Sequence, residues 1–136
     1  MARTAVVTGA GSGVGRSTTL KLLSDGWNVA LVGRRESALQ ETVALAGSMT
    51  GRAMVSATDI GDPKAVHRLA QSVVAALGDV EVLVNAAGTN VPHRALEVLS
   101  QPDYDLMLNT NLHGAYHCVQ AFLTGMRSRE IGRAHV

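Results

Sequence analysis

The stretch that decides the fold is residues 4–15, which read TAVVTGAGSGVG. Its first five residues are rich in β-branched side chains, which is typical of a strand buried on both faces. A glycine cluster from Gly9 to Gly15 follows at once, and a helical pattern then continues to about Asp25. Glycines leave backbone amides open to approach, and a helix N-terminus attracts negative charge, so this turn is suited to hold phosphate groups.

The alternation of strand and helix continues outward from this turn. Further strands are predicted at residues 28–33, 52–57 and 80–84, and helices at residues 37–46 and 63–77 and from about Gln101 onward. The helix at residues 63–77 has one apolar face at helical spacing, formed by Val66, Leu69, Ala70, Val73, Val74 and Leu77. The last helix is expected to have one as well, formed by Leu108, Leu112, Ala115, Val119, Phe122 and Met126. Strands that alternate with helices of ten or more residues predict a parallel sheet with helices on both faces. We therefore expect an α/β fold, a Rossmann-type doubly wound parallel sheet that stops after about four strands and the following long helix. The expected strand order is 3-2-1-4, with a ligand at the switch point between strands one and four.

Composition excludes several classes of protein. Hydrophobic residues make up 46% and charged residues 17% of the chain, a balance that is typical of a folded domain and not of a disordered one. The net charge of +1 gives no reason to expect nucleic acid or a membrane surface as a partner. Cys118 is the only cysteine, so an internal disulfide is impossible. Without a secretory-leader pattern at the N-terminus, we expect a cytoplasmic protein.

The five histidines raise the question of a metal site. Two of them, His113 and His117, stand four residues apart in the predicted last helix. No glutamate completes a zinc-protease pattern around them, and no third ligand is evident. We therefore predict that the protein has no metal site.

Two further motifs follow the glycine loop. Residues 85–88, NAAG, come directly after the fourth predicted strand, and residues 111–114, NLHG, lie within the last predicted helix. Together with T-G-x-x-x-G-x-G at residues 8–15, they resemble the classical short-chain dehydrogenase/reductase family, whose members carry N-N-A-G and N-x-x-G in this order. Ala86 replaces the second asparagine of N-N-A-G. The resemblance covers the chain to about Arg129, and it explains all three motifs, whereas a methyltransferase would explain only the first.

The resemblance implies a role for each matching residue. Gly9, Gly13 and Gly15 would shape the loop, with Ser12 and Val14 against the ribose and phosphates of a nicotinamide dinucleotide. Asp59 and Ile60 would contact the adenine. The inner ribose would be lined by residues of the NAAG segment, namely Asn85, Ala86, Ala87 and Gly88. Asn111 would be the catalytic asparagine that holds a water in the proton relay.

Each of these polar residues also has a purely structural interpretation. Asp59 would then be a loop acid that caps the next helix, although Asp62, followed by proline, already serves as that cap. Asn85 would satisfy backbone groups at the end of a strand. Asn111 would be a polar interruption of a helix, and asparagine is a poor residue there, which favours a specific role.

The end of the second predicted strand indicates which nicotinamide cofactor is used. It reads Gly33-Arg34-Arg35, where an NAD site usually carries an acid that accepts hydrogen bonds from the ribose hydroxyls. An arginine instead attracts a 2′-phosphate and can bind it with two parallel hydrogen bonds. We therefore predict that Arg34 contacts the cofactor and that NADP is favoured, with NAD as the alternative. Arg35 has a second interpretation, as a solvated residue at the start of a helix.

The reaction of the family also requires Tyr-x-x-x-Lys, and the chain does not contain it. Tyr104 and Tyr116 are followed four positions later by Leu108 and Gln120. We therefore predict an oxidoreductase parent that transfers hydride between the cofactor and a carbonyl or alcohol substrate, while this chain is inactive. The parent is expected to be a homodimer or homotetramer. The alternative is a non-catalytic dinucleotide-binding or sensing module, which the DNA downstream of the codon for Arg129 would distinguish.

The last seven residues, EIGRAHV, lose the family pattern. Residues 131–136 can be encoded by ATC GGA AGA GCA CAC GTC, the start of a common short-read sequencing adapter, and a stop codon follows in that frame. We predict that residues 1–129 are the NAD(P)-binding part and that residues 130–136 are a non-native tail. We also expect poor stability, because the fourth strand would then present an unpaired edge.

Overall fold

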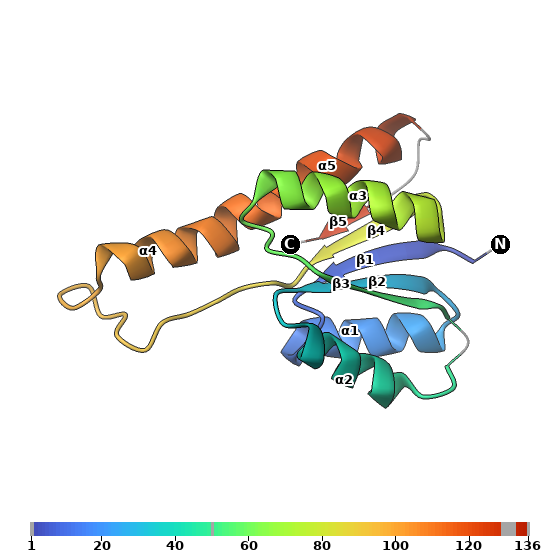
Figure 1. Cartoon of the computed structure of the whole chain (residues 1–136), viewed down its shortest axis with the longest axis horizontal. Coiled ribbons are helices and arrows are strands. Elements are labelled where there is room, and N and C mark those ends of the chain that lie inside the picture. The colour runs from blue at the N-terminus through green and yellow to red at the C-terminus, as the bar shows by residue number, and fades with distance from the viewer. Residues whose placement is uncertain (1, 50, 129–132, 136) are drawn as a thin grey trace.

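The computed structural model of the protein describes residues 2–49, 51–128 and 133–135. Its strands are β1 (Thr4–Thr8), β2 (Asn28–Gly33), β3 (Ala53–Ala57), β4 (Val80–Asn85) and β5 (Arg133–His135). Its helices are α1 (Gly13–Ser24), α2 (Glu36–Ala46), α3 (Pro63–Leu77), α4 (Gln101–Leu108) and α5 (Gly114–Ser128), with a π-helical turn η1 (Asn109–His113) between the last two. The helices α1 and α2 cover one face of the sheet, and α3 and α5 cover the other (Figure 1).

The strands form one parallel sheet in the order β3-β2-β1-β4-β5. The chain moves outward from β1 to β2 and β3, and then returns to place β4 on the other side of β1. The predicted order 3-2-1-4 is therefore confirmed, and the order reverses between β1 and β4. At the carboxyl end of β1, Thr8 is paired with both Val32 and Asn85, so the segments that follow β1, β2 and β4 emerge together.

In the central strands, consecutive side chains point to opposite faces of the sheet, where they fill two separate hydrophobic cores. On β1, Val6 belongs to the cluster under α3 and α5, and Val7 to the cluster under α1 and α2. The apolar face predicted for the third helix is confirmed at Val66, Leu69, Val73 and Leu77, which are all buried, whereas Val74 at its margin is 44% exposed. Burial raises the pKa of the Cys118 thiol to about 12, so this side chain is an uncharged core residue at neutral pH.

The prediction of an open edge on the fourth strand is wrong. Residues 133–135 form β5, which pairs in parallel with Val82, Leu83 and Val84. A parallel neighbour needs a long crossover connection, and α5 provides one. Residues 129–132 and 136 lie outside the described residues, so the proposed non-native origin of residues 130–136 stays a prediction.

The last predicted helix is not continuous. In η1 the amide of Gly114 donates to the carbonyl of Asn109, five residues earlier, where an α-helix would have four. One extra residue in this turn rotates the side chains that precede it by about 100° about the helix axis, relative to their positions in a continuous α-helix. The buried side consequently includes Thr110, Gly114 and Cys118, while Leu112, predicted to lie on the apolar face, is 58% exposed.

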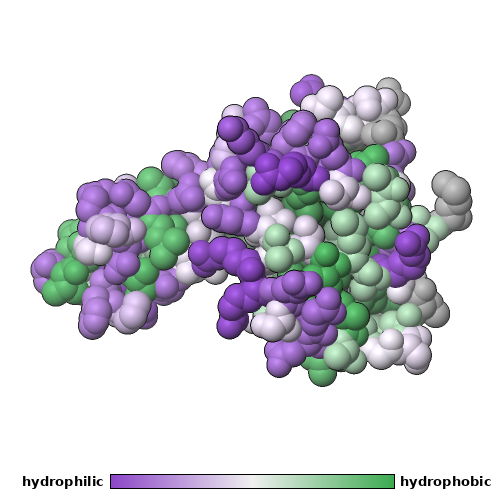
Figure 2. Space-filling model, viewed as in Figure 1, coloured by the Kyte–Doolittle hydropathy of each residue, from purple (hydrophilic) through white to green (hydrophobic). Residues whose placement is uncertain are grey.

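The segment from residue 89 to the end of α4 projects from the body of the molecule (Figure 1). No residue of α4 is buried, and Leu96 in the preceding loop is 88% exposed. Apolar side chains are visible among polar ones on this projection (Figure 2). Within the described part of the chain, no helix has the length and apolar character needed to cross a membrane.

Candidate functional site

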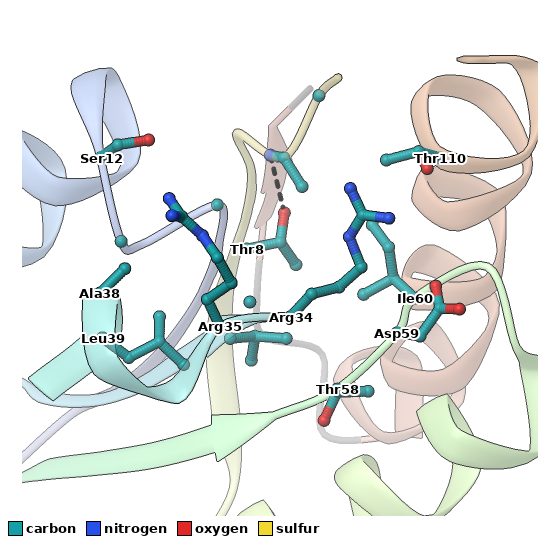
Figure 3. Close-up of a pocket in the computed structure, with 16 residues that line it drawn as sticks. Thr8, Ser12, Arg34, Arg35, Ala38, Leu39, Thr58, Asp59, Ile60 and Thr110 are labelled. Atoms are coloured by element: carbon teal, nitrogen blue, oxygen red, sulfur yellow. Dashed lines mark hydrogen bonds between the residues drawn. The ribbon is translucent and has the colours of Figure 1, made fainter. Parts of the chain in front are cut away.

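A cavity of about 430 Å³ opens at the carboxyl ends of the strands, beside the switch point. Its volume lies within the usual range for sites that bind small molecules, and its position is where doubly wound sheets bind their ligands. Figure 3 shows the side chains that surround it. The lining residues are Thr8, Gly9, Gly11, Ser12, Val32, Gly33, Arg34, Arg35, Ala38, Leu39, Thr58, Asp59, Ile60, Ala87, Gly88 and Thr110.

Three glycines shape the loop after β1 for different reasons. Gly9 has a φ of +65°, and a Cβ there would lie 2.7 Å from the carbonyl oxygen of Ala86. A Cβ on Gly15 would collide with the carbonyl oxygen of Gly9. Gly13 also has a positive φ, +53°, but none of the described atoms lies within 4 Å of its Cβ position. The first two glycines therefore allow backbone segments to touch, and the third leaves open space at the start of α1.

The N-terminus of α1 is available to an anion. Ser12 is the N-cap residue and lines the cavity, yet its hydroxyl does not cap the helix within the described structure. The first amides of a helix lack partners inside that helix, and the helix dipole places partial positive charge there. Together these features suit a phosphate group in front of the loop.

A buried polar cluster fixes the glycine loop against α2. The guanidinium of Arg16 donates to the carbonyl of Gly11 at 2.6 Å and to the hydroxyl of Thr42 at 2.9 Å. The same hydroxyl donates to the carbonyl of Ala10 at 2.8 Å. These contacts satisfy the backbone carbonyls of Ala10 and Gly11. Sequence analysis missed Arg16 and Thr42, because no motif relates residues 26 apart.

Positive charge lies where β2 ends. Arg34 and Arg35 both line the cavity and are both exposed. In the view of Figure 3, the guanidinium of Arg35 points toward the side of Ser12, and that of Arg34 toward the side of Thr110. Arg35 is also the N-cap residue of α2 and makes no side-chain cap within the described structure. The second arginine is therefore a cavity residue as well, although the sequence left a solvated role open for it.

The predicted adenine contacts follow β3. Asp59 and Ile60 both line the cavity, the first exposed and the second buried. The helix α3 is capped by Asp62, which accepts a hydrogen bond from the amide of Lys64. The carboxylate of Asp59 accepts instead from the amide of Gly61 at 2.9 Å. The structural interpretation would require Asp59 to be the cap of α3, and it is not.

Thr8 connects the glycine loop to the NAAG segment. Its hydroxyl accepts a hydrogen bond from the amide of Ala87 at 3.1 Å, drawn as a dashed line in Figure 3. The side-chain amide of Asn85 is buried, and neither of its polar atoms has a partner among the described residues. A buried polar group without a partner costs about 1–3 kcal/mol. The structural interpretation of Asn85, in which its side chain satisfies backbone groups, is not what the described residues show.

Both ends of the Asn111 side-chain amide bond the backbone of one residue. Its Oδ1 accepts from the amide of Thr89 at 2.8 Å, and its Nδ2 donates to the carbonyl of Thr89 at 3.0 Å. Asn111 therefore ties η1 to the chain that follows Gly88. Its position in a π-helical turn is in keeping with a specific role, because such turns occur frequently at functional sites.

The cavity thus brings together only part of the predicted site. The predicted residues that line it are Gly9, Ser12, Arg34, Asp59, Ile60, Ala87 and Gly88. Those that do not line it are Gly13, Val14, Gly15, Asn85, Ala86 and Asn111. All of the second group lie in the segments that frame the cavity. No cluster of three or more metal-ligating side chains occurs among the described residues.

A parallel sheet covered on both faces, with a cavity at its switch point, defines the class of doubly wound α/β proteins. The family model described as short chain dehydrogenase matches residues 3–134, so the chain belongs to that family. It is 34% identical over 132 residues to "Short-chain reductase protein NovJ" of Streptomyces niveus. The matched region covers 97% of this chain and 49% of that relative. The chain spans about half the length of the curated relatives it matches.

Solved structures show the same fold. An alcohol dehydrogenase from the archaeon Thermococcus sibiricus, complexed with 5-hydroxy-NADP, has a TM-score of 0.90 and 27% identity, covering 98% of this chain and 57% of the other. A xylitol dehydrogenase with bound NAD⁺ has a TM-score of 0.91 and 28% identity, covering 97% of this chain and 51% of the other. The Rossmann-type fold predicted from the sequence is confirmed.

Proposed function

We propose that the chain is the dinucleotide-binding half of an oxidoreductase that transfers hydride between NADP(H) and a carbonyl or alcohol substrate. The observation that carries this proposal is a single cavity that combines an uncapped helix N-terminus with two arginines at the end of β2. NADP(H) needs both features: the helix N-terminus for its pyrophosphate and the arginines for its 2′-phosphate. Both NADP and NAD occur in the related structures, so the arginines are the argument for NADP.

In this proposal, each segment around the cavity holds a different part of the dinucleotide. Ser12, Val14 and the amides of the glycine loop hold the ribose and phosphates, and the loop after β3 holds the adenine. The NAAG segment lies along the inner ribose, with Ala87 and Gly88 lining the cavity and the amide of Asn85, which has no partner among the described residues, buried outside its lining. When bound, the nicotinamide ring supplies the hydride chemistry.

Asn111 is proposed to hold a water of the proton relay through its backbone carbonyl. Its side-chain amide is held at both ends by Thr89, which fixes the position of the residue in η1 and so of that carbonyl. A π-helical turn changes the carbonyl ladder locally, because its hydrogen bonds run to the fifth residue and not to the fourth.

The first test is Arg34→Asp, with binding of NADPH and NADH measured by isothermal titration calorimetry. Loss of a charge-assisted hydrogen bond costs about 1.5–3 kcal/mol, so NADPH affinity should fall about 10- to 100-fold. NADH affinity should change far less, because NADH carries no 2′-phosphate. The control is Arg68→Asp, the same charge reversal on the exposed side of α3. Equal weakening of both cofactors, or none, would remove the argument for NADP.

The chain as printed should bind the dinucleotide without turning over substrate. Neither Tyr104 nor Tyr116 is followed by lysine at the fourth position, so no side chain is poised to move the alcohol or carbonyl proton. The measurement is NADPH oxidation, or NADP reduction, with a panel of ketones and alcohols, followed at 340 nm. Turnover with any of them would contradict the proposal that this half is inactive alone.

A further inference from the structure

The loop between β3 and α3 is held in place by the helix that carries Asn111. The Nδ1 atom of His117, on α5, lies 3.0 Å from the backbone carbonyl oxygen of Ile60. A carbonyl oxygen can only accept, so Nδ1 carries the hydrogen and donates it. This contact joins residues 57 positions apart. It fixes the main chain at Ile60, the last of the three cavity-lining residues of this loop.

The same surface of η1 and α5 fits the loop by shape. Ile60 is 6% exposed, and a Cβ on Gly114 would lie 2.6 Å from its Cγ1 atom. A Cβ on Gly61 would collide with the side-chain amide of Asn109. At Gly114 and Gly61, therefore, the backbone lies so close to a neighbouring side chain that a Cβ would not fit. Residues 109, 114 and 117 therefore form a continuous support under the loop.

The loop passes this support on to the cavity. The carboxylate of Asp59 accepts from the amide of Gly61, so residues 59–61 form a turn closed by a hydrogen bond. Holding the carbonyl of Ile60 consequently fixes the direction of the two side chains that the turn presents to the cavity, Asp59 and Ile60. His117 itself does not line the cavity and would act only through this turn.

We infer that His117 is a positioning residue for the adenine end of the dinucleotide. This inference rests on the proposed function, in which the adenine lies against Asp59 and Ile60. The donor at Nδ1, and not the bulk of the ring, is the feature required. Residues 109–117 then support two loops beside the cavity. His117 holds the loop after β3 at Ile60, and Asn111 holds the chain after β4 at Thr89.

The experiment compares His117→Leu, which removes the donor, with His117→Asn, which keeps an N–H group at a similar reach. His67→Leu, on the exposed side of α3, is the matched control. The probes are NADPH and adenosine 2′,5′-bisphosphate, which carries only the adenine end, both titrated by calorimetry. Loss of one hydrogen bond should raise the Kd of both probes about three- to tenfold in His117→Leu. His117→Asn and the control should stay within about twofold of the unmodified chain.

The outcomes separate the inference from the proposed function. If the unmodified chain binds neither probe, the proposed function falls, and the inference falls with it. If it binds both and His117→Leu binds them equally well, the inference alone is overturned. Equal losses in His117→Leu and His117→Asn would also overturn it, because packing would then be responsible. If circular dichroism shows His117→Leu unfolded, His117→Gln replaces it. Gln places its amide one methylene farther out, so a Gln variant as tight as the Asn variant contradicts the inference.

Discussion

Gly9→Val should unfold the ligand-binding edge of the sheet and abolish dinucleotide binding. Gly9 has a φ of +65°, a left-handed conformation that costs an ordinary residue about 1–2 kcal/mol and makes a β-branched residue a clear outlier. A Cβ would also lie 2.7 Å from the Ala86 carbonyl oxygen and 2.8 Å from the Ala87 Cα. That backbone cannot yield freely, because the amide of Ala87 is bonded to Thr8.

Strain and collision together should lower the free energy of unfolding by more than about 3 kcal/mol, against a typical total of about 5–15 kcal/mol. Urea denaturation followed by circular dichroism gives this value. The matched control is Gly47→Val, because Gly47 has a φ of +58° and no described atom within 4 Å of its Cβ position. The control should lose only the cost of placing a side chain at a positive φ. Similar losses in the two variants would show that contact with Ala86 contributes nothing.

The architecture was predictable because its signals are local. The β-branched run at Thr4–Thr8 and the period of Val66, Leu69 and Val73 are visible within a few residues, and alternation of such segments leaves few topologies. Asp62 before Pro63 marked the start of α3 in the same way, and the structure confirms it as the cap. The switch point then follows from the strand order, since the carboxyl ends of β1 and β4 must be neighbours.

The parts that escaped prediction depend on contacts between distant residues. Nothing in the sequence indicates that the last helix gains one residue at Asn109–His113, so the predicted apolar face is wrong at Leu112. Beyond this turn, Phe122 and Met126 are buried as predicted. The bonds of Arg16 to Thr42 and of His117 to Ile60 join segments that meet only in the folded chain. Pairing of β5 with β4 likewise depends on where α5 returns the chain. Sequence motifs located the framing segments, while the structure shows what holds them together.

Gly13→Val should abolish dinucleotide binding while leaving the fold almost unchanged. Gly13 is exposed at the start of α1, and the Cβ position faces space free of described atoms, unlike that of Gly9. The folded chain should therefore lose only about 1–2 kcal/mol for the positive φ of +53°, with its helical content retained. The valine would instead fill the space in front of the helix N-terminus, where the proposed pyrophosphate must approach the amides. NADPH binding should weaken at least about 100-fold, since both steric access and the amide contacts are lost.

The control for Gly13→Val is Gly78→Val, which also has a positive φ, +86°, and no described atom within 4 Å of its Cβ position. Gly78 follows α3 and precedes β4, so it lies at the opposite end of the strands from the cavity. Urea denaturation gives the stability cost of the new backbone strain in each variant separately, and only Gly13→Val should lose NADPH binding in calorimetry. Because Gly78→Val also forces a side chain onto a positive-φ position, retained binding in that variant shows that backbone strain alone does not abolish binding. Retained binding in Gly13→Val would mean that the loop after β1 is not the phosphate site, and the proposed function would lose its main support.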